Sequence, residues 1–319
     1  MHARQIKGRL HFFLHSRETD FLPFKTQSRE RACEARVGHH MPDPTEDVAA
    51  DALTLLSICV LLWLVSLRLG KTWPVDFIWS GWPLLQCALI IARDPHGGLF
   101  ARRALTCTLV ALWGGRLTYN FVSRGGIGHE DWRYTDMRQQ FGSHFWWVSF
   151  FSVFLGQSIF MFGGCLSLYD ALLETHALDV FDAAAACVSL GAISLEATAD
   201  LQMDAFQRER RMVTTAPVID RGVWLWSRHP NYFAEASWWW GLWFLSARSG
   251  GPGGLAWIGP AGITSLFLLI SIKLLEDRQL RTKGAAYLEY MRDVPSDLIP
   301  IPPALARVLG PQWLTLGRH

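Results

Sequence analysis

The sequence has few charged residues for its length, and it lacks the short motifs of soluble nucleotide-binding and hydrolytic enzymes. Only 18% of its 319 residues are Asp, Glu, Lys or Arg, whereas soluble domains carry about 25%. It contains no GxGxxG, GxxxxGK[ST], HExxH or GxSxG sequence. If the chain binds a nucleotide, we therefore expect a helical membrane fold to hold it and not a Rossmann domain.

Cysteine spacing and net charge exclude further classes. The six cysteines are scattered and never have CxxC spacing, which argues against a zinc site and against a disulfide framework. The net charge is only +2, so no nucleic-acid partner is indicated. No Asn-x-Ser/Thr sequon occurs, so glycosylation gives no information on topology.

Long apolar runs are the main feature of the chain. A helix that crosses a membrane needs about 20 mostly apolar residues, and we find about seven such segments. The 16 tryptophans fit this reading, because Trp favours the membrane–water boundary. The predicted fold class is all-α, a polytopic membrane helix bundle. The predicted spans are roughly 52–69, 74–92, 104–122, 145–169, 178–197, 232–246 and 255–275.

Composition and charge placement predict the domains and the orientation. Residues 1–50 read as a disordered or targeting tail, unless Met41 is the true first residue, residues 51–303 as the membrane domain, and residues 304–319 as a C-terminal tail. Lys and Arg gather after the first, third and fifth spans and in the C-terminal tail, which predicts a cytoplasmic C-terminus. The basic residues of the first 40 positions do not fit this orientation.

The segment 227–235 is the strongest local signal for a site. Its proline suits the first turn of a helix, which places Asn231 and Glu235 on one helical face. A helix N-terminus attracts phosphate, and Arg228 and His229 would add charge-assisted donors. We predict a polar site at the cytoplasmic rim of the membrane. The alternative is an interfacial anchor for lipid headgroups.

A second group of polar residues lies at the end of the fifth predicted span. Glu196, Asp200 and Asp204 repeat every four residues, so they share one helical face. Acidic residues at the end of a span are costly unless they face a polar cavity. An aspartate could accept hydrogen bonds from ribose hydroxyls, and the arginines that begin at Arg208 could bind a phosphate. The alternative is a solvated extension of the helix.

Other polar residues lie within or beside predicted spans. We expect Arg116, near the middle of a span, to pair with a carboxylate, and Asp76 is the candidate partner. A purely structural ion pair is the alternative reading. We expect Gln157 to join neighbouring helices by hydrogen bonds. Tyr287 and Tyr290 could stack on a ligand or anchor the chain at the interface.

Taken in order, these motifs resemble those of the membrane proteins related to the steroid 5α-reductases. The resemblance covers residues 76–300 and is closest to the branch marked by RHPNYFGE followed by WWG, which here occupies residues 228–235 and 239–241. Ala234 stands where glycine is usual and adds only a methyl group. Further matching residues are Asp76, Trp79, 113–117, 130–134, Asp200, Gln202, Phe206, Gly222, Trp224, Tyr287, Tyr290 and Pro300.

The resemblance implies seven spans, a luminal N-terminus, a cytosolic C-terminus and an NADPH cavity open to the cytosol. It suggests the endoplasmic reticulum as the membrane. Arg228 and His229 belong to this branch and are not shared with the steroid enzymes themselves. The residues expected to bind the cofactor are Asp200, Arg208, Trp224, Arg228, His229, Asn231, Tyr232, Glu235, Tyr287 and Tyr290.

The implied reaction is hydride transfer from NADPH to the β-carbon of an enone in a lipid, sterol-like or polyprenyl substrate. An acid polarises the carbonyl oxygen as enolate charge develops, and a proton then reaches the α-carbon. Tyr119 is the best match for the catalytic tyrosine of the steroid enzymes, and Tyr134 is the second candidate.

Two other functions stay open at this point. The isoprenylcysteine carboxyl methyltransferases are membrane proteins with a similar RHPxYxxE-like loop, and they bind S-adenosylmethionine. Asp200, Asn231 and the segment 130–134 favour the reductase reading over this one. A non-catalytic lipid-binding or scaffold protein with the same fold is the third possibility.

Overall fold

The computed structural model describes residues 44–212, 217–247 and 255–309. The chain divides into two compact units, residues 1–48 and residues 49–319. Most of the predicted N-terminal tail and the last ten residues of the predicted C-terminal tail (310–319) lie outside the described residues.

Every regular element among the described residues is a helix. Short 3-10 helices occur at η1 (Trp73–Asp76), η2 (Gly142–His144) and η4 (Gly222–Leu225). Single π-helical segments, η3 (Phe150–Leu155) and η6 (Phe267–Ser271), join α6 to α7 and α11 to α12. The α-helices are α2 (Pro44–Leu69), α3 (Phe77–Arg93), α4 (Phe100–Ser123), α5 (Trp132–Phe141), α6 (Phe145–Ser149), α7 (Gly156–Cys165), α8 (Ser167–Leu173), α9 (Val180–Met212), α10 (Pro230–Ser246), α11 (Ile258–Leu266), α12 (Ile272–Lys283), α13 (Ala285–Asp293) and α14 (Pro303–Leu309).

The lengths and hydropathies of these helices confirm a polytopic membrane bundle for the described part of the chain. Five helical stretches are long and apolar enough to cross a membrane. Every predicted span is helical, but α4 and α10 are not among the five. Helix α10 has 17 residues, fewer than the roughly 20 that a crossing needs, and α4 contains three arginines. The five stretches are Glu46–Leu69, Trp73–Arg93, Trp132–Leu173, Val180–Met212 and Ile258–Lys283.

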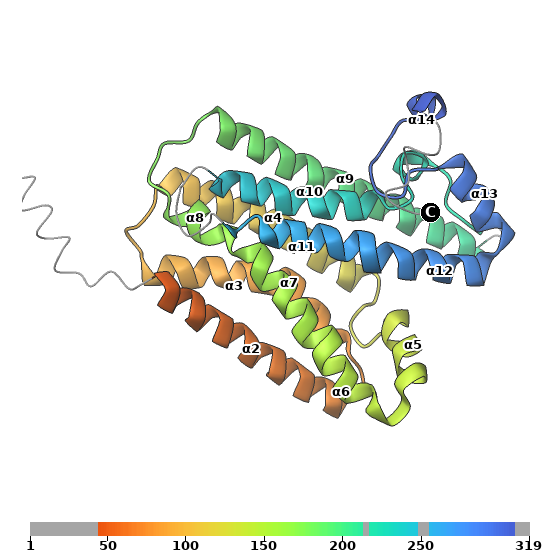
Figure 1. Cartoon of the computed structure of the whole chain (residues 1–319), viewed down its shortest axis with the longest axis horizontal. Coiled ribbons are helices and arrows are strands. Elements are labelled where there is room, and N and C mark those ends of the chain that lie inside the picture. The colour runs from red at the N-terminus through yellow and green to blue at the C-terminus, as the bar shows by residue number, and fades with distance from the viewer. Residues whose placement is uncertain (1–43, 213–216, 248–254, 310–319) are drawn as a thin grey trace, which may run out of the picture. The chain divides into compact units, whose positions relative to one another are not determined.

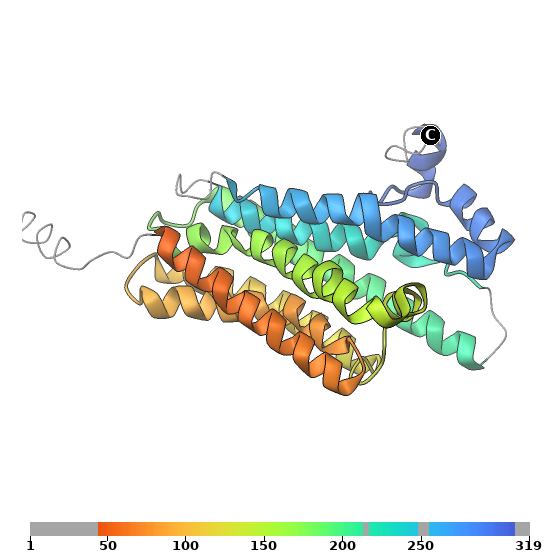
Figure 2. The same cartoon turned by 60° about the horizontal axis from the view of Figure 1, so that its bottom comes forward.

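Helices α4, α9 and α10 form the part of the bundle that carries most of the predicted site residues. Figures 1 and 2 show that α10 lies alongside α9 over the whole length of α10. Gly241 permits this close approach, because a Cβ there would overlap the Ser189 side chain of α9. Helix α4 packs on α9, and Trp113 of α4 stacks on Trp238 of α10 with ring centroids 4.0 Å apart.

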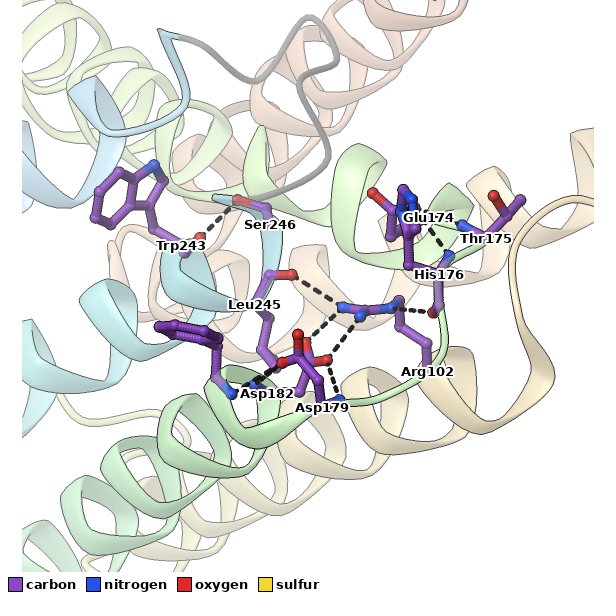
Figure 3. Close-up of polar contacts among 10 residues, drawn as sticks. Arg102, Glu174, Thr175, His176, Asp179, Asp182, Trp243, Leu245 and Ser246 are labelled. Atoms are coloured by element: carbon purple, nitrogen blue, oxygen red, sulfur yellow. Dashed lines mark hydrogen bonds and ion pairs between the residues drawn. The ribbon is translucent and has the colours of Figure 1, made fainter.

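A buried ion pair fastens the same three helices at the end of the bundle where α9 begins (Figure 3). The Arg102 guanidinium donates to both carboxylate oxygens of Asp182, at 2.6 and 2.7 Å, and to the Leu245 carbonyl at 3.2 Å. The backbone N–H of Asp179 donates to the same carboxylate at 2.9 Å. Arg102 and Asp182 are both buried, so the pair holds the starts of α4 and α9 against the end of α10. It fixes the helices from which the site is built.

Candidate functional site

Polar side chains of α4 lie opposite the carboxylates that α9 carries every fourth residue. Arg116 Nη2 lies 2.7 Å from Glu196 Oε1, and Arg116 Nη1 donates to Asp200 Oδ2 at 2.7 Å. Asn120 Nδ2 donates to the same Asp200 oxygen at 2.9 Å. We call these residues and their neighbours along the same faces the polar column. Its members are Arg116, Asn120, Arg124, Glu196, Asp200, Asp204 and Glu235.

The polar column is buried at one end and reaches the surface at the other. Arg124 Nε bonds to Asp204 Oδ1 at 2.6 Å, and the two side chains are 41% and 24% exposed. The side chains of Arg116 and Asp200 are only 12% and 13% exposed. A ligand could therefore meet the column from the Arg124–Asp204 end.

Arg116 pairs with carboxylates, as expected. The prediction that Asp76 is its partner was wrong, because the partners are Glu196 and Asp200. Asp76 lies at the end of η1, just before α3, and it accepts a hydrogen bond from Tyr134. The donors on α4 and the acids on α9 share a spacing of about four residues along packed helices. This matching spacing brings Arg116 to Glu196 and Asp200, which the sequence had already placed on one face.

Glu235 of α10 closes the buried end of the column. Its Oε2 accepts from Trp113 Nε1 at 2.9 Å, and its Oε1 accepts from Trp239 Nε1 at 3.0 Å. Both oxygens of Glu235 are thus engaged, one by Trp113 of α4 and the other by Trp239 of α10 itself. That this residue contacts a cofactor stays a prediction.

A second polar centre, which we call the tyrosine centre, is built around Tyr134. The Tyr134 hydroxyl donates to Asp76 Oδ1 at 3.0 Å and accepts from Gln157 Nε2 at 3.2 Å. Trp79 Nε1 donates to Gln157 Oε1 at 2.7 Å and so fixes the orientation of the amide. Tyr134 is only 2% exposed. Gln157 joins α7 to α3 and α5, as the sequence predicted.

The residues before Tyr134 position the helix that carries it. Glu130 accepts from the backbone N–H and the hydroxyl of Thr72, both at 2.9 Å, which ties the loop before α5 to the loop after α2. Asp131 caps α5 by accepting from the backbone N–H of Arg133 at 2.9 Å. The segment 130–134 therefore holds the first turn of α5 where Tyr134 meets Asp76.

The two predicted catalytic tyrosines lie in different surroundings. Tyr119 of α4 is 72% exposed, whereas Tyr134 is buried and hydrogen-bonded to a carboxylate. Asp76 and Gln157 hold the Tyr134 hydroxyl in a fixed geometry, which suits a group that must donate to a substrate oxygen. The geometry therefore favours Tyr134, the second candidate from the sequence.

Arg228 is engaged by groups within the chain. Its Nε donates to Glu276 Oε1 at 2.8 Å, and its Nη1 donates to the carbonyls of Val294 and Pro295 at 2.8 and 2.7 Å. Arg228 and Glu276 are both buried. The arginine thus fastens the loop after α13 and the middle of α12 to the start of α10. A cofactor contact by Arg228 stays a prediction.

His229 and Tyr232 belong to a stack of rings beside this ion pair. The ring of Tyr232 lies parallel to those of His229, at 5.5 Å, and Phe267, at 4.9 Å. His229 Nε2 lies 3.2 Å from Glu276 Oε1. Burial lowers the pKa of His229 below its ordinary value, although the hydrogen bond to Glu276 acts in the opposite direction. The imidazole is therefore neutral at neutral pH.

Two of the predicted aromatic ligands, Trp224 of η4 and Tyr290 of α13, connect α13 to α9. Trp224 Nε1 donates to the Ala199 carbonyl at 3.1 Å, and the Tyr290 hydroxyl donates to the Trp224 carbonyl at 2.7 Å. Tyr287 and Tyr290 are both buried, with ring centroids 5.8 Å apart. Burial raises the pKa of Tyr290. These contacts are structural, and a ligand contact by any of the three stays a prediction.

Asn231, Arg208 and Asp200 are the predicted cofactor residues with surface nearest the exposed end of the column. Asn231 is partly exposed in the first turn of α10, on the face that carries Glu235. Arg208 is exposed on the part of α9 beyond Asp204. Asn120, which the sequence grouped with Arg116 and Arg124 at the exit of the third span, stands four residues after Arg116 and donates to Asp200.

Comparison with known proteins gives a family but no activity. Residues 62–294 match the family described as "Protein of unknown function (DUF1295)". The chain is 27% identical over 215 residues to an uncharacterized protein of Schizosaccharomyces pombe, and the match covers 59% of this chain and 61% of that protein. The chain thus spans less than two thirds of that relative. No solved structure matches. The polar column and the tyrosine centre both lie within the matched residues.

Proposed function

Because the chain belongs to the DUF1295 family of membrane proteins, we propose its function from the site itself: it is an oxidoreductase that uses NADPH to reduce the activated C=C bond of a lipid or sterol-like enone. The observation that carries this proposal is the Tyr134–Asp76 pair, a buried hydroxyl 3.0 Å from a carboxylate oxygen. Such a pair suits proton transfer to a substrate that enters from the lipid.

Tyr134 acts as the acid of the reaction. When bound, NADPH would supply a hydride to the β-carbon of the enone, and negative charge would develop on the carbonyl oxygen. The Tyr134 hydroxyl donates to that oxygen, and Asp76, when protonated, donates in turn to the tyrosine oxygen. One proton taken up from water reaches the α-carbon, so the reaction consumes NADPH and one proton and gives NADP⁺ and the saturated ketone. Gln157 and Trp79 keep the hydroxyl in place through this sequence.

The exposed end of the polar column suits the polar parts of NADPH. Asp200 offers carboxylate oxygens, and Asn231 offers an amide, to ribose hydroxyls or to the carboxamide of the nicotinamide. Arg208 offers an exposed guanidinium to a phosphate. All three belong to α9 or α10, which pack together, so one ligand could reach them together.

The proposed placement in the membrane has seven crossings. Helices α4 and α10 join the five long apolar stretches as crossings, because α4 packs on α9, α10 packs along its length, and the α9 carboxylates neutralise Arg116. The C-terminus is then cytosolic, and the exposed end of the column faces the cytosol. We place the protein in the endoplasmic reticulum and relate its family to the steroid 5α-reductases, as the ordered motifs suggest.

The proposal is tested by NADPH consumption in proteoliposomes with a panel of enone lipids that includes a 4-en-3-one sterol. The wild-type protein should oxidise NADPH and reduce at least one lipid of the panel. Tyr134→Phe should lower that rate by about 10²–10⁴-fold, whereas Tyr119→Phe, the matched control, should leave it unchanged. Equal rates for wild type and Tyr134→Phe would remove the basis of the proposal. Methyl transfer from S-adenosylmethionine in the same vesicles would favour the methyltransferase alternative.

A further inference from the structure

Two carboxyl groups meet inside the membrane domain where α9 and α10 pack together. Glu196 of α9 and Glu235 of α10 are both buried, and both meet the same turn of α4, where Arg116 lies 2.7 Å from Glu196 Oε1 and Trp113 donates to Glu235 Oε2 at 2.9 Å. An ionised carboxylate accepts hydrogen bonds but cannot donate one. Two buried carboxyl groups beside a single guanidinium, which Asp200 also shares, favour a proton on one of them.

Fixed donors hold each carboxyl of this pair in position. Trp113 and Trp239 donate to the two oxygens of Glu235 at 2.9 and 3.0 Å. Arg116 Nη2 lies 2.7 Å from Glu196 Oε1. The two indoles are packed edge-to-face, with ring centroids 5.3 Å apart, so Glu235 cannot turn away from Glu196 without leaving buried N–H groups unsatisfied.

The charges that face the pair favour protonation. Arg116 is shared between Glu196 and Asp200, 2.7 Å from each, so one guanidinium lies among three carboxyl groups. Like charges that are removed from water are costly to keep side by side. A proton held between Glu196 and Glu235 removes one of these negative charges without disturbing the contacts of Arg116.

We propose that Glu196 and Glu235 form a proton-binding site that holds one shared proton at neutral pH and exchanges it through the exposed end of the polar column. Asp200 and Asp204 continue from Glu196 in steps of four residues, and Asp204 with Arg124 reaches the surface. The charge of the column then depends on whether the site is loaded, so a charged ligand that enters at this end binds with linked uptake or release of a proton. The site does not depend on the proposed reductase activity.

The proton can be observed directly by infrared spectroscopy of the full chain in lipid nanodiscs at neutral pH. We expect the C=O band of a protonated carboxyl group, shifted to lower frequency in D₂O, and lost in Glu235→Gln. Glu209→Gln is the matched control, because Glu209 is a half-exposed carboxylate of the same α9 helix that pairs with Arg221. The band should persist in this control.

The pH dependence of stability provides a second readout. A site that holds a proton in the folded chain, and releases it on unfolding, loses stability as pH rises from neutral, because the folded state then binds more protons than the unfolded state. In Glu235→Gln the amide N–H replaces the shared proton, so the melting temperature should become less dependent on pH over this range. Glu209→Gln should keep the wild-type slope.

Two results would overturn the proposal. A wild-type spectrum without a protonated-carboxyl band at neutral pH means that both groups are ionised, and this result needs no variant to fold. A band of full intensity in both Glu196→Gln and Glu235→Gln assigns the proton to another residue.

Discussion

The Tyr134 hydroxyl donates a hydrogen bond to Oδ1 of Asp76 across 3.0 Å, which joins the first turn of α5 to the residue before α3. Gln157 of α7 completes the contact from a third segment. Three parts of the chain that are distant in sequence thus meet at one buried hydroxyl. The Asp76 carboxyl group has a structural role as the acceptor of the Tyr134 hydroxyl and a proposed chemical role as a proton donor. Different substitutions of Asp76 can test these two roles separately.

Asp76→Asn should preserve the fold and abolish turnover. The amide oxygen still accepts from Tyr134, but the amide cannot deliver a carboxyl proton. Asp76→Ala should in addition destabilise the protein by about 1–3 kcal/mol, because it leaves a buried hydroxyl without its acceptor. Melting temperatures and enone turnover of the two variants check this. A fully active Asp76→Asn protein would show that the carboxyl group has no chemical role.

Arg116 should be coupled energetically to Asp200 and not to Asp76. Removing one partner of a buried ion pair costs about 3–5 kcal/mol, so Arg116→Met should be strongly destabilised, and Asp200→Asn should recover part of that loss in the double variant. The same cycle with Asp76→Asn should give additive effects. Chemical denaturation of the single and double variants measures both couplings. Coupling to Asp76 of the same size would contradict the pairing seen between α4 and α9.

Arg228→Met should release the loop after α13. The arginine donates to the carbonyls of Val294 and Pro295 and to Glu276, so its loss leaves buried acceptors unpaired. Hydrogen exchange should become faster in the peptides that cover residues 294–298. Arg221→Met is the matched control, since Arg221 forms a half-exposed pair with Glu209, worth about 0–1 kcal/mol. Equal exchange in the two variants would argue against the fastening role of Arg228.

His229 should make the protein less stable in mild acid. Burial lowers the pKa of the folded imidazole below its ordinary value, so between the two pKa values the unfolded chain binds more protons than the folded chain. Stability is then complete above the ordinary histidine pKa of about 6.5 and falls as pH drops below it. His229→Gln keeps a donor toward Glu276 and should flatten the melting temperature between about pH 5 and pH 7. An unchanged slope would assign the acid sensitivity to another group.

The features that the sequence predicted correctly are those that follow from helical spacing and from the length of apolar runs. The four-residue repeat of Glu196, Asp200 and Asp204 placed them on one face, and apolar length identified the helices. The predicted partner of Arg116 was wrong. The choice between Asp76 and the acids of α9 depends on which helices pack together, and the periodicity of one sequence does not contain this information.

The role of Arg228 could not be read from the sequence for a related reason. Two of its acceptors are backbone carbonyls, 66 and 67 residues away, and any residue type provides a carbonyl. Tyr119 and Tyr134 were ranked by motif position, whereas their burial depends on how α5 folds back against α3 and α7. The hydrogen bonds of Glu130 to Thr72 and the capping of α5 by Asp131 fix the position of α5.

Thermal stabilisation of the purified protein by NADPH tests the central claim most directly. A ligand that binds only the folded state must raise its melting temperature. NADPH should do so, and the shift should disappear in Asn231→Ala and persist in Tyr119→Phe, each compared with its own ligand-free baseline. Stabilisation by S-adenosylmethionine alone, or an NADPH shift of full size in Asn231→Ala, would contradict an NADPH site at the exposed end of the polar column.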